Sequence, residues 1–232
     1  MHLYAVKYGE SQLNARFIFR DTTSEELVRI SWSYYIALHQ GKTILFDVGF
    51  RNSVTAQTWG IELQDVHEAT KQLLPQNNVD LIFITHHHFD HIENIDLFPT
   101  AQIVISAPDY LHAMERGSIC VQERLRQHHV TIVEDEYIYA DTFRFKVIGG
   151  HTVGSAVIYF ENQQRKYVLT GDECYQCVNL LNQRPIGIYE NAVNNESFLH
   201  DAFQEGYIPL PCHDLAIFDT YPRFNEHIVQ IL

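Results

Sequence analysis

The segment THHHFDHIEN, at residues 85–94, places four histidines and an aspartate within six consecutive positions. The apolar run LIFI directly precedes it at residues 81–84. A run that is apolar at every position is typical of a strand buried on both faces, so the polar segment is expected to emerge at the C-terminal end of that strand. Imidazole nitrogens and carboxylate oxygens crowded in this way are the donors of a metal site.

The spacing within this segment predicts which side chains converge. In an extended loop, residues two apart point the same way, so His86 and His88 can meet at one point while His87 faces elsewhere. Asp90 and His91 then offer an oxygen and a nitrogen to a neighbouring point. The pattern HxHxDH therefore supplies two ligands to each of two metal positions. Since a metal site needs three or four ligands, the others must come from distant parts of the chain.

Three further candidates occupy turns that follow strand-like runs. His151 lies in the glycine-rich turn GGHTVGS, where the backbone can approach closely. Asp172 lies in TGDECY, and His213 lies in PLPCHD. Together with the first segment, these candidates are enough for two divalent ions. We expect one ion to be held by His86, His88 and His151 and the other by Asp90, His91 and His213, with the Asp172 carboxylate bridging both.

Short runs rich in aromatic and β-branched residues predict the strands that must position these side chains. They lie at residues 3–8, 32–38, 43–46, 79–84, 102–105, 143–148, 156–160 and 167–169. Helix-like stretches lie at residues 66–74, 108–114, 118–127 and 196–204, and residues 179–195 indicate a long loop over one face. Strands, then helix, then strands again predict two sheets packed face to face with helices outside them. At 232 residues, the chain (1–232) is expected to form a single domain.

These residues resemble the metallo-β-lactamase fold superfamily of metal-dependent hydrolases. The resemblance extends from ILFDVG, which contains Asp47, through HHHFDH and GHTVGS, to TGD and the final CHD. Five elements in one order are more specific than any one of them alone. The resemblance implies an α+β fold, a four-layer αββα sandwich. It also implies that Asp47 supports the metal loop and is not itself a metal ligand.

Several members of the superfamily match this sequence poorly. Dinuclear β-lactamases lack a bridging aspartate at the position of Asp172, and oxygen-reducing diiron relatives carry a glutamate where His88 stands. Thioesterases of the glyoxalase II type need an additional C-terminal helical domain, but the sequence ends shortly after His213. RNA-processing relatives use basic or appended surfaces, whereas this chain has 16 Lys and Arg against 29 Asp and Glu, a formal net charge of −13.

The remaining close match is the N-acyl homoserine lactonase group of quorum-quenching enzymes. Its bridging aspartate is followed three residues later by an active-site tyrosine, and Asp172 and Tyr175 reproduce that spacing in DECY. The stretch DLFPTAQIVIS, at residues 96–106, is also similar. The sequence departs from the group at IEN, residues 92–94, where small residues or glycine are usual, and this leaves the pocket shape and the substrate open. Pocket walls are expected from Phe50, Ile186, Ile188 and Tyr189, which carry no motif.

The resemblance implies a dinuclear metal-dependent hydrolase that opens a lactone or ester by attack of a metal-bridging hydroxide. Tyr175 would donate to the oxyanion, and Asp90 would carry the proton to the leaving group. Zinc is the expected metal, with iron, cobalt and manganese as alternatives, because imidazole and carboxylate accept all four. The alternative enzyme is a thioesterase or phosphodiesterase of the same fold acting on a small metabolite. A non-catalytic metal-binding or sensory protein is the alternative from another class.

Composition sets the remaining expectations. No segment approaches the roughly 18 apolar residues that cross a bilayer, and the N-terminus lacks the pattern of a secretion signal. We therefore expect a cytoplasmic protein that does not enter a membrane. The acidic net charge disfavours nucleic acid as a partner, which leaves a small-molecule ester or lactone substrate. The oligomeric state is not determined by the sequence.

Other histidines and the cysteines are assigned ordinary roles. A single histidine beside a strand is usually satisfied by backbone or solvent, and short motif matches often mislead. This applies to His39, His67, His112, His128, His129, His200 and His227, and His87 is expected to support the ligands beside it. Cys120, Cys174, Cys177 and Cys212 are expected to be reduced thiols. Cys212 adjoins a ligand, but neighbours on an extended segment point opposite ways, so it should face away from the metal.

Overall fold

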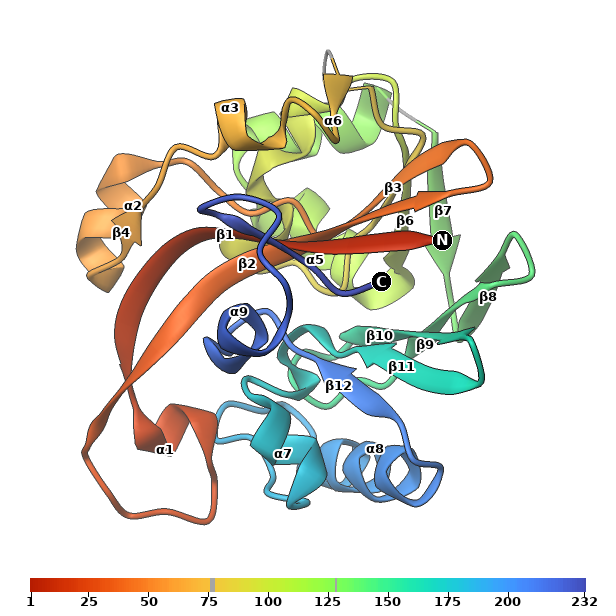
Figure 1. The fold of residues 1–232 in the computed structure, drawn as a ribbon. Helices are drawn as coiled ribbons and strands as arrows, with labels where there is room; N and C mark the ends of the chain where they lie inside the picture. The colour runs from red at the N-terminus through yellow and green to blue at the C-terminus, as the bar shows by residue number, and fades with distance from the viewer. Residues whose placement is uncertain (76–77, 128) are drawn as a thin grey trace.

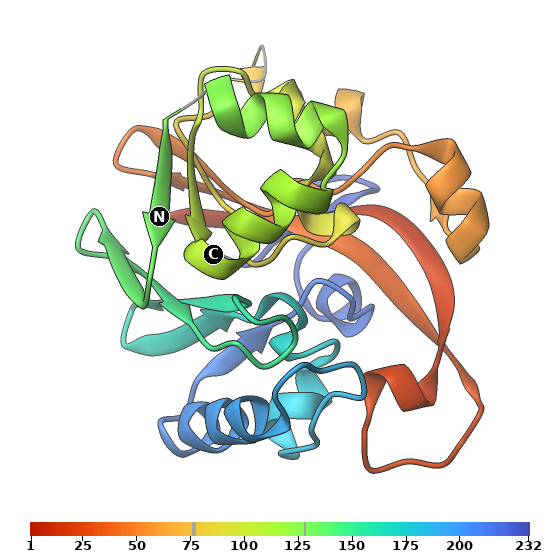
Figure 2. The ribbon, with the colours of Figure 1, turned by 180° about the vertical axis from the view of Figure 1, so that it is seen from behind.

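The computed structural model describes residues 1–75, 78–127 and 129–232. Two β-sheets pack face to face in the middle of the molecule, and helices lie outside both of them (Figure 1). In the view from behind, α5 (Ala107–Arg116) and α6 (Ile119–Gln127), in green, cover one sheet, and α8 (Ala192–Gln204), in blue, covers the other (Figure 2). The expected αββα sandwich is confirmed.

The first sheet combines antiparallel and parallel strands. In spatial order it contains β13 (Ile228–Gln230), β1 (His2–Asn14), β2 (Leu27–His39), β3 (Lys42–Phe46), β5 (Leu81–Phe83), β6 (Gln102–Ser106) and β7 (Val130–Val133), with β4 (Glu62–Leu63) paired to β1. Neighbours from β13 to β3 are antiparallel, and neighbours from β3 to β7 are parallel. Parallel neighbours need crossover connections. These carry α2 (Ser53–Trp59), α3 (His67–Thr70), α5 and α6 over the outer face.

The second sheet is smaller and carries three of the turns that matter for the site. Its spatial order is β12 (Ile208–Leu210), β11 (Arg165–Leu169), β10 (Ala156–Asn162), β9 (Phe143–Val147) and β8 (Glu136–Tyr139). β12 runs parallel to β11, and the other neighbours are antiparallel. Helices α7 (Cys177–Leu181) and α8 pack on its outer face, and α9 (Ala216–Thr220) precedes β13.

Aromatic side chains fill the space between the two sheets. Phe46 and Phe83, from the first sheet, stack with ring centroids 5.5 Å apart. Phe143 and Phe145, from the second sheet, pack against them and are fully buried. Interdigitated rings of this size provide most of the apolar area that holds two sheets together. The sheets are therefore a fixed platform for the turns at their ends.

Strands β1 and β2 extend beyond the sandwich and carry α1 (Ala15–Ile18) at their far end (Figure 1). This arm docks on the loop at residues 182–191. Gly187 N–H donates to Phe17 O (3.0 Å), and Arg20 N–H donates to Pro185 O (2.9 Å). A Cβ on Gly187 would lie 1.8 Å from Arg16 O, so only glycine allows this approach. The arm and the loop together form one wall of the site described below.

The expected strands at residues 3–8 and 32–38 are longer in the structure, as β1 and β2, and an expected helix and an expected loop are shorter. The predicted helix at residues 66–74 is only α3, one turn long, because the chain turns after Thr70. Pro75 follows closely, and the residue before a proline is disfavoured in helical conformation. The predicted loop at residues 179–195 is also too long. Asn191 accepts a hydrogen bond from Asn194 N–H and so begins α8, which makes this asparagine a helix cap.

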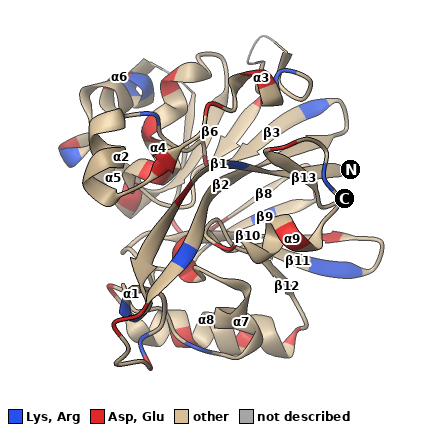
Figure 3. Cartoon of the chain, turned by 60° about the vertical axis from the view of Figure 1, so that its left-hand side comes forward, with Lys and Arg blue, Asp and Glu red and all other residues tan. Residues whose placement is uncertain are grey.

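The basic side chains are spread over the molecule, and the cysteines are unpaired. Figure 3 shows Lys and Arg distributed over separate strands, helices and loops. No helix within the described ranges is long and apolar enough to cross a membrane. All four cysteines are free.

Candidate metal centre

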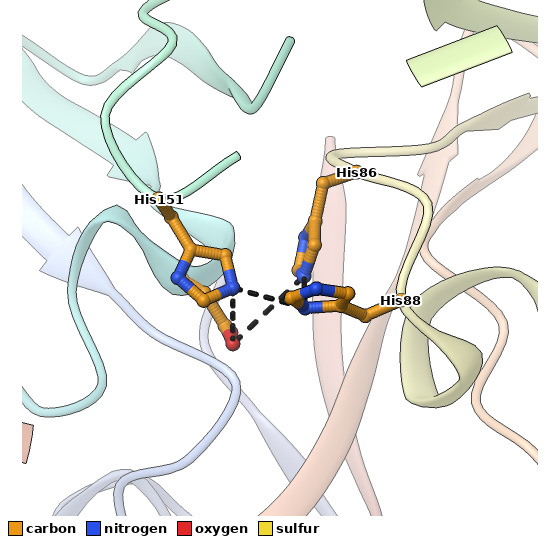
Figure 4. A group of neighbouring side chains, drawn as sticks. His86, His88 and His151 are labelled. Atoms are coloured by element: carbon orange, nitrogen blue, oxygen red, sulfur yellow. Dashed lines mark hydrogen bonds and ion pairs between the residues drawn. The ribbon is translucent and has the colours of Figure 1, made fainter. Parts of the chain in front are cut away.

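The structure brings His86, His88, His151 and Asp172 together at the open edge between the two sheets. His151 approaches from one side and the two other rings from the opposite side (Figure 4). His88 Nδ1 lies 3.0 Å from both His86 Nε2 and His151 Nε2. Asp172 Oδ2 lies 3.5 Å from His151 Nε2 and 3.9 Å from His86 Nε2. Four donor atoms therefore surround one point.

A second cluster adjoins the first through the same aspartate. His91 Nε2 lies 3.1 Å from Asp90 Oδ2 and 3.2 Å from Asp172 Oδ1. His213 Nε2 lies 3.4 Å from Asp90 Oδ2 and 3.2 Å from Asp172 Oδ1. The two oxygens of Asp172 thus face different clusters, which is the arrangement of a bridging carboxylate. All seven predicted ligands lie in these two clusters.

The hydrogen bonds of two rings leave their Nε2 atoms facing the centre. Nδ1 of His151 lies 3.0 Å from Ile188 O, and Nδ1 of His213 lies 2.9 Å from Ser31 O. A carbonyl oxygen accepts only, so each Nδ1 carries the proton and leaves Nε2 free to bind a cation. Among the described residues, His91 Nε2 is buried without a hydrogen-bond partner, as is Asp172 Oδ1. Orphaned donor atoms of this kind fit divalent metal ions.

The electrostatics of the two clusters also favour cations. Burial and the neighbouring rings lower the pKa of His86, and burial with His151 lowers the pKa of His88 to about 4, so both rings are neutral. Burial would lower the pKa of His213 as well, yet the carboxylates of Asp172 and Asp90 raise it to about 10. The carboxylates therefore stabilise positive charge at this point.

Asp47 fixes the orientation of the metal loop, as the resemblance implied. One of its oxygens accepts from Thr85 N–H (2.8 Å), and the other accepts from Thr85 Oγ1 (2.8 Å). The second oxygen also lies 2.7 Å from His91 Nδ1. A carboxylate behind a metal-binding imidazole sets its tautomer and raises its basicity. Cys212 Sγ lies 3.9 Å from the same oxygen and within 4.8 Å of a nitrogen of His91, and its side chain is buried between the sheets.

Glu173 was not identified from the sequence, and it holds the turn that carries His151. Its Oε1 accepts from Gly150 N–H (2.9 Å), His151 N–H (2.9 Å) and Ser155 Oγ (2.5 Å). Its Oε2 accepts from Asn195 Nδ2 (2.8 Å). The side chain is fully buried. The only signal in the sequence is an acidic residue directly after the bridging aspartate, which is too common to be informative.

The remaining histidines that the structure describes lie outside the two clusters. His87 points away from them, with Nδ1 2.9 Å from Asp109 Oδ1, and its ring stacks on His112 at 3.7 Å between centroids. Partners of other described histidines are Thr142 for His39, Gln183 for His200 and Gln64 for His227. His67 and His129 take no part in the clusters, and His128 lies outside the described residues.

A cavity of about 310 Å³ opens onto both clusters. Its apolar lining consists of Leu13, Ile30, Trp32, Trp59, Phe89, Tyr175 and Ile188. The Tyr175 ring lies 5.5 Å from the His213 ring and 5.9 Å from the His151 ring. Of the expected wall residues, Ile188 lines this cavity, Tyr189 lines an adjoining cavity of about 810 Å³, Ile186 is buried in the core and Phe50 lines a separate cavity.

Comparisons with known proteins agree with this geometry. A family model described as the metallo-beta-lactamase superfamily matches residues 27–195. An N-acyl homoserine lactone hydrolase with N-hexanoyl-L-homoserine bound at its catalytic metal centre is 19% identical, with a TM-score of 0.81 over 97% of this chain and 98% of that chain. A mutant of AiiA from B. thuringiensis with N-decanoyl-L-homoserine at its active site is 18% identical, with a TM-score of 0.80 over 97% and 98%. The dizinc quorum-quenching lactonase AidC is 15% identical, with a TM-score of 0.70 over 99% and 93%. Structural similarity at these identities establishes the shared fold.

We expect His88→Ala to remove one ion and His87→Ala to retain both. His88 faces the first cluster, whereas His87 faces Asp109. Metal per chain after dialysis, measured by plasma mass spectrometry, should fall from about two to about one in the first variant and stay near two in the second. Equal loss in both variants would contradict the assignment of His88 as a ligand.

Glu173→Gln should weaken metal binding without touching a ligand. In one orientation the amide N–H faces the donors of the turn that holds His151, and in the other it faces the donor Asn195 Nδ2, so Glu173 loses a hydrogen bond either way and holds the turn less firmly. We expect metal affinity to fall by about 10- to 100-fold, measured by competition with a chromophoric chelator. Glu161→Gln, an exposed carboxylate on β10, is the control and should bind metal as the unchanged protein does. Unchanged affinity in Glu173→Gln would show that Glu173 does not position His151.

Proposed function

The chain belongs to the metallo-beta-lactamase superfamily, and we propose that it is a dinuclear metal-dependent hydrolase that opens the ring of N-acyl homoserine lactones. The observation that carries this proposal is the position of Tyr175, which lies in an apolar cavity beside two ligand clusters that share Asp172. An N-acyl homoserine lactone hydrolase of the same fold, with N-hexanoyl-L-homoserine at its catalytic metal centre, and the AiiA mutant, with N-decanoyl-L-homoserine at its active site, support the substrate class.

The seven side chains would hold two divalent ions, and zinc is the metal we propose. Bound there, the ions would lower the pKa of a water molecule to near neutrality and would polarise the carbonyl group that is attacked. The imidazole and carboxylate set also accepts iron, cobalt or manganese. The chain's own residues then position the substrate and handle the proton.

Tyr175 is placed to stabilise negative charge that develops on the carbonyl oxygen. Burial, together with the nearby Asp172 carboxylate, raises the pKa of its hydroxyl, so the hydroxyl keeps its proton at neutral pH. A protonated hydroxyl in a cavity that excludes water is an effective donor to an oxyanion. The rings of His151 and His213 pack against Tyr175 and restrict its movement.

Asp90 is placed to transfer the proton. Its Oδ2 faces His91 and His213, whereas Oδ1 has no hydrogen-bond partner among the described residues. A carboxylate with one oxygen committed and one free can take a proton from water and give it to the leaving alkoxide. Burial opposes ionisation of Asp90, but His91 and His213 hold its pKa below the usual range, so it is a base at neutral pH.

The apolar lining of the cavity is suited to an acyl chain. Trp59 is half exposed at its edge, and Phe89 lies against it with ring centroids 5.8 Å apart. Leu13 and Ile188 come from the arm and from the 182–191 loop. Enclosure of a chain by these residues removes apolar surface from water, which contributes about 0.8 kcal/mol for each buried methylene.

A comparison of substrates tests the proposed function. Metal-loaded protein should hydrolyse N-hexanoyl and N-decanoyl homoserine lactones in preference to an aryl thioester and an aryl phosphodiester, as measured by kcat/KM. Preference for the thioester or the phosphodiester would overturn the lactonase proposal while leaving a hydrolase. Hydrolysis of none of the four, with both ions bound, would leave the non-catalytic alternative.

Tyr175→Phe should lower kcat on the best lactone by about tenfold or more, because one donor to the oxyanion is lost. Metal content should not change, since the hydroxyl is not a ligand. Tyr207→Phe is the matched control, because Tyr207 directly precedes β12, packs against Tyr159 and does not line the cavity at the metal centre. Unchanged kcat in Tyr175→Phe would remove this residue from the reaction.

A further inference from the structure

A second cavity, of about 530 Å³, lies under the segment that joins β3 to β5. It shares no lining residue with the cavity beside Tyr175. Its lining includes Tyr8 and Tyr34, the residues Val48, Phe50 and Arg51 after β3, and Asn94, Leu97 and Phe98 after the metal loop, with Leu63–Thr70 on the outside. The volume is in the range of small-molecule sites, roughly 300–1,000 Å³.

Tyr34 presents a hydroxyl to this cavity. The side chain is 7% exposed, and its hydroxyl makes no hydrogen bond to any other part of the chain that the structure describes. Burial raises the pKa of Tyr34, so the hydroxyl keeps its proton and is available as a donor. The hydroxyl is therefore free to donate to a ligand that brings an acceptor into the cavity.

The charged side chains that line the cavity, Arg51 and Asp65, are both exposed to solvent. Both terminal nitrogens of Arg51 donate to Asp96, and Nη1 also donates to Asn94 Oδ1 (2.8 Å). Asp65 accepts from the backbone N–H of His67 (3.0 Å). The other lining side chains are mostly apolar: Val48, Phe50, Leu63, Val66, Leu74, Leu97 and Phe98. The lining therefore favours an uncharged ligand.

We propose that this cavity binds an uncharged, largely apolar small molecule whose hydrogen-bond acceptor meets the Tyr34 hydroxyl. The site shares no lining residue with the cavity at the metal centre, and the proposal does not depend on the reaction proposed there. The occupant would contact Tyr8, Val48 and Asn94, which support the metal loop from behind. Tyr8 Oη donates to Asp90 O (3.0 Å), and Val48 N–H donates to His91 O (3.0 Å). Binding is therefore placed to influence the metal loop without entering it.

The test uses metal-loaded protein and two probes that differ at one end. 6-Phenylhexanamide has an apolar body and a neutral acceptor, whereas 6-phenylhexylamine has the same body with a positive charge and no acceptor. Calorimetric titration should show binding of the amide and at least tenfold weaker binding of the amine. Failure of the amide to bind, or equal affinity for both probes, would overturn the proposal.

Three variants locate the bound amide. Tyr34→Phe keeps the ring and removes the donor, and should weaken binding by about fivefold, the value of one hydrogen bond. Leu97→Trp fills the second cavity and should abolish binding, whereas Leu13→Trp fills the cavity at the metal centre and should leave it unchanged. Loss of amide binding in Leu13→Trp with retention in Leu97→Trp would place the ligand at the metal centre and contradict the proposal. Thermal unfolding of each variant checks that it is folded. Of the three variants, Tyr34→Phe changes the side-chain volume least and still tests the hydrogen bond to the ligand.

Discussion

The carboxylate of Asp172 is the constraint on which the site depends, because each of its oxygens faces a different group of ligands. Oδ2 lies near His86 and His151, and Oδ1 lies near His91 and His213. A buried carboxylate is costly unless it meets positive charge or donors, and no Lys or Arg within the described ranges forms an ion pair with it. Two cations would satisfy both oxygens. The fold must therefore bring the ends of β5, β11 and β12 and the turn before β10 to one place.

Contacts between the sheets hold these ends together. Ala156 N–H donates to Thr85 O (2.8 Å), which joins the second sheet to the start of the metal loop. Gly171 has a φ of 47°, and a Cβ there would lie 2.7 Å from Thr85, so this turn needs glycine to come so close. Asp47 and Glu173 lie behind the candidate ligands and accept hydrogen bonds from backbone and side-chain donors of the two turns. Carboxylates that accept from loop backbone convert flexible turns into fixed ligand positions.

The candidate ligands could be grouped from the sequence because strand-end spacing is a local property. An apolar run followed by HxHxDH specifies which rings converge, and the turns at His151, Asp172 and His213 follow the same rule. Apart from Asp47, whose role the resemblance implied, supporting residues could not be predicted because their partners are distant in the chain: Glu173 needs Asn195, and the approach of Gly187 to the arm appears only once the chain is folded. The predicted helix boundaries were wrong at two places, where Asn191 caps α8 and where the chain approaches Pro75.

Phe50 lines the second cavity and packs against aromatic rings that line the cavity at the metal centre, which corrects its expected role as a wall of the latter. The contacting rings form a layer between the two cavities. Phe50 lies on the far side of that layer, 4.8 Å from the Phe89 ring and 6.2 Å from the Trp32 ring. Trp32 in turn packs edge-on against the ligand His213 at 4.9 Å. Because protein interiors are close-packed, a change in the position of one ring is transmitted to its neighbours. The shape of the cavity at the metal centre therefore depends on a residue that does not line it, which explains why a pocket wall without a motif cannot be read from the sequence.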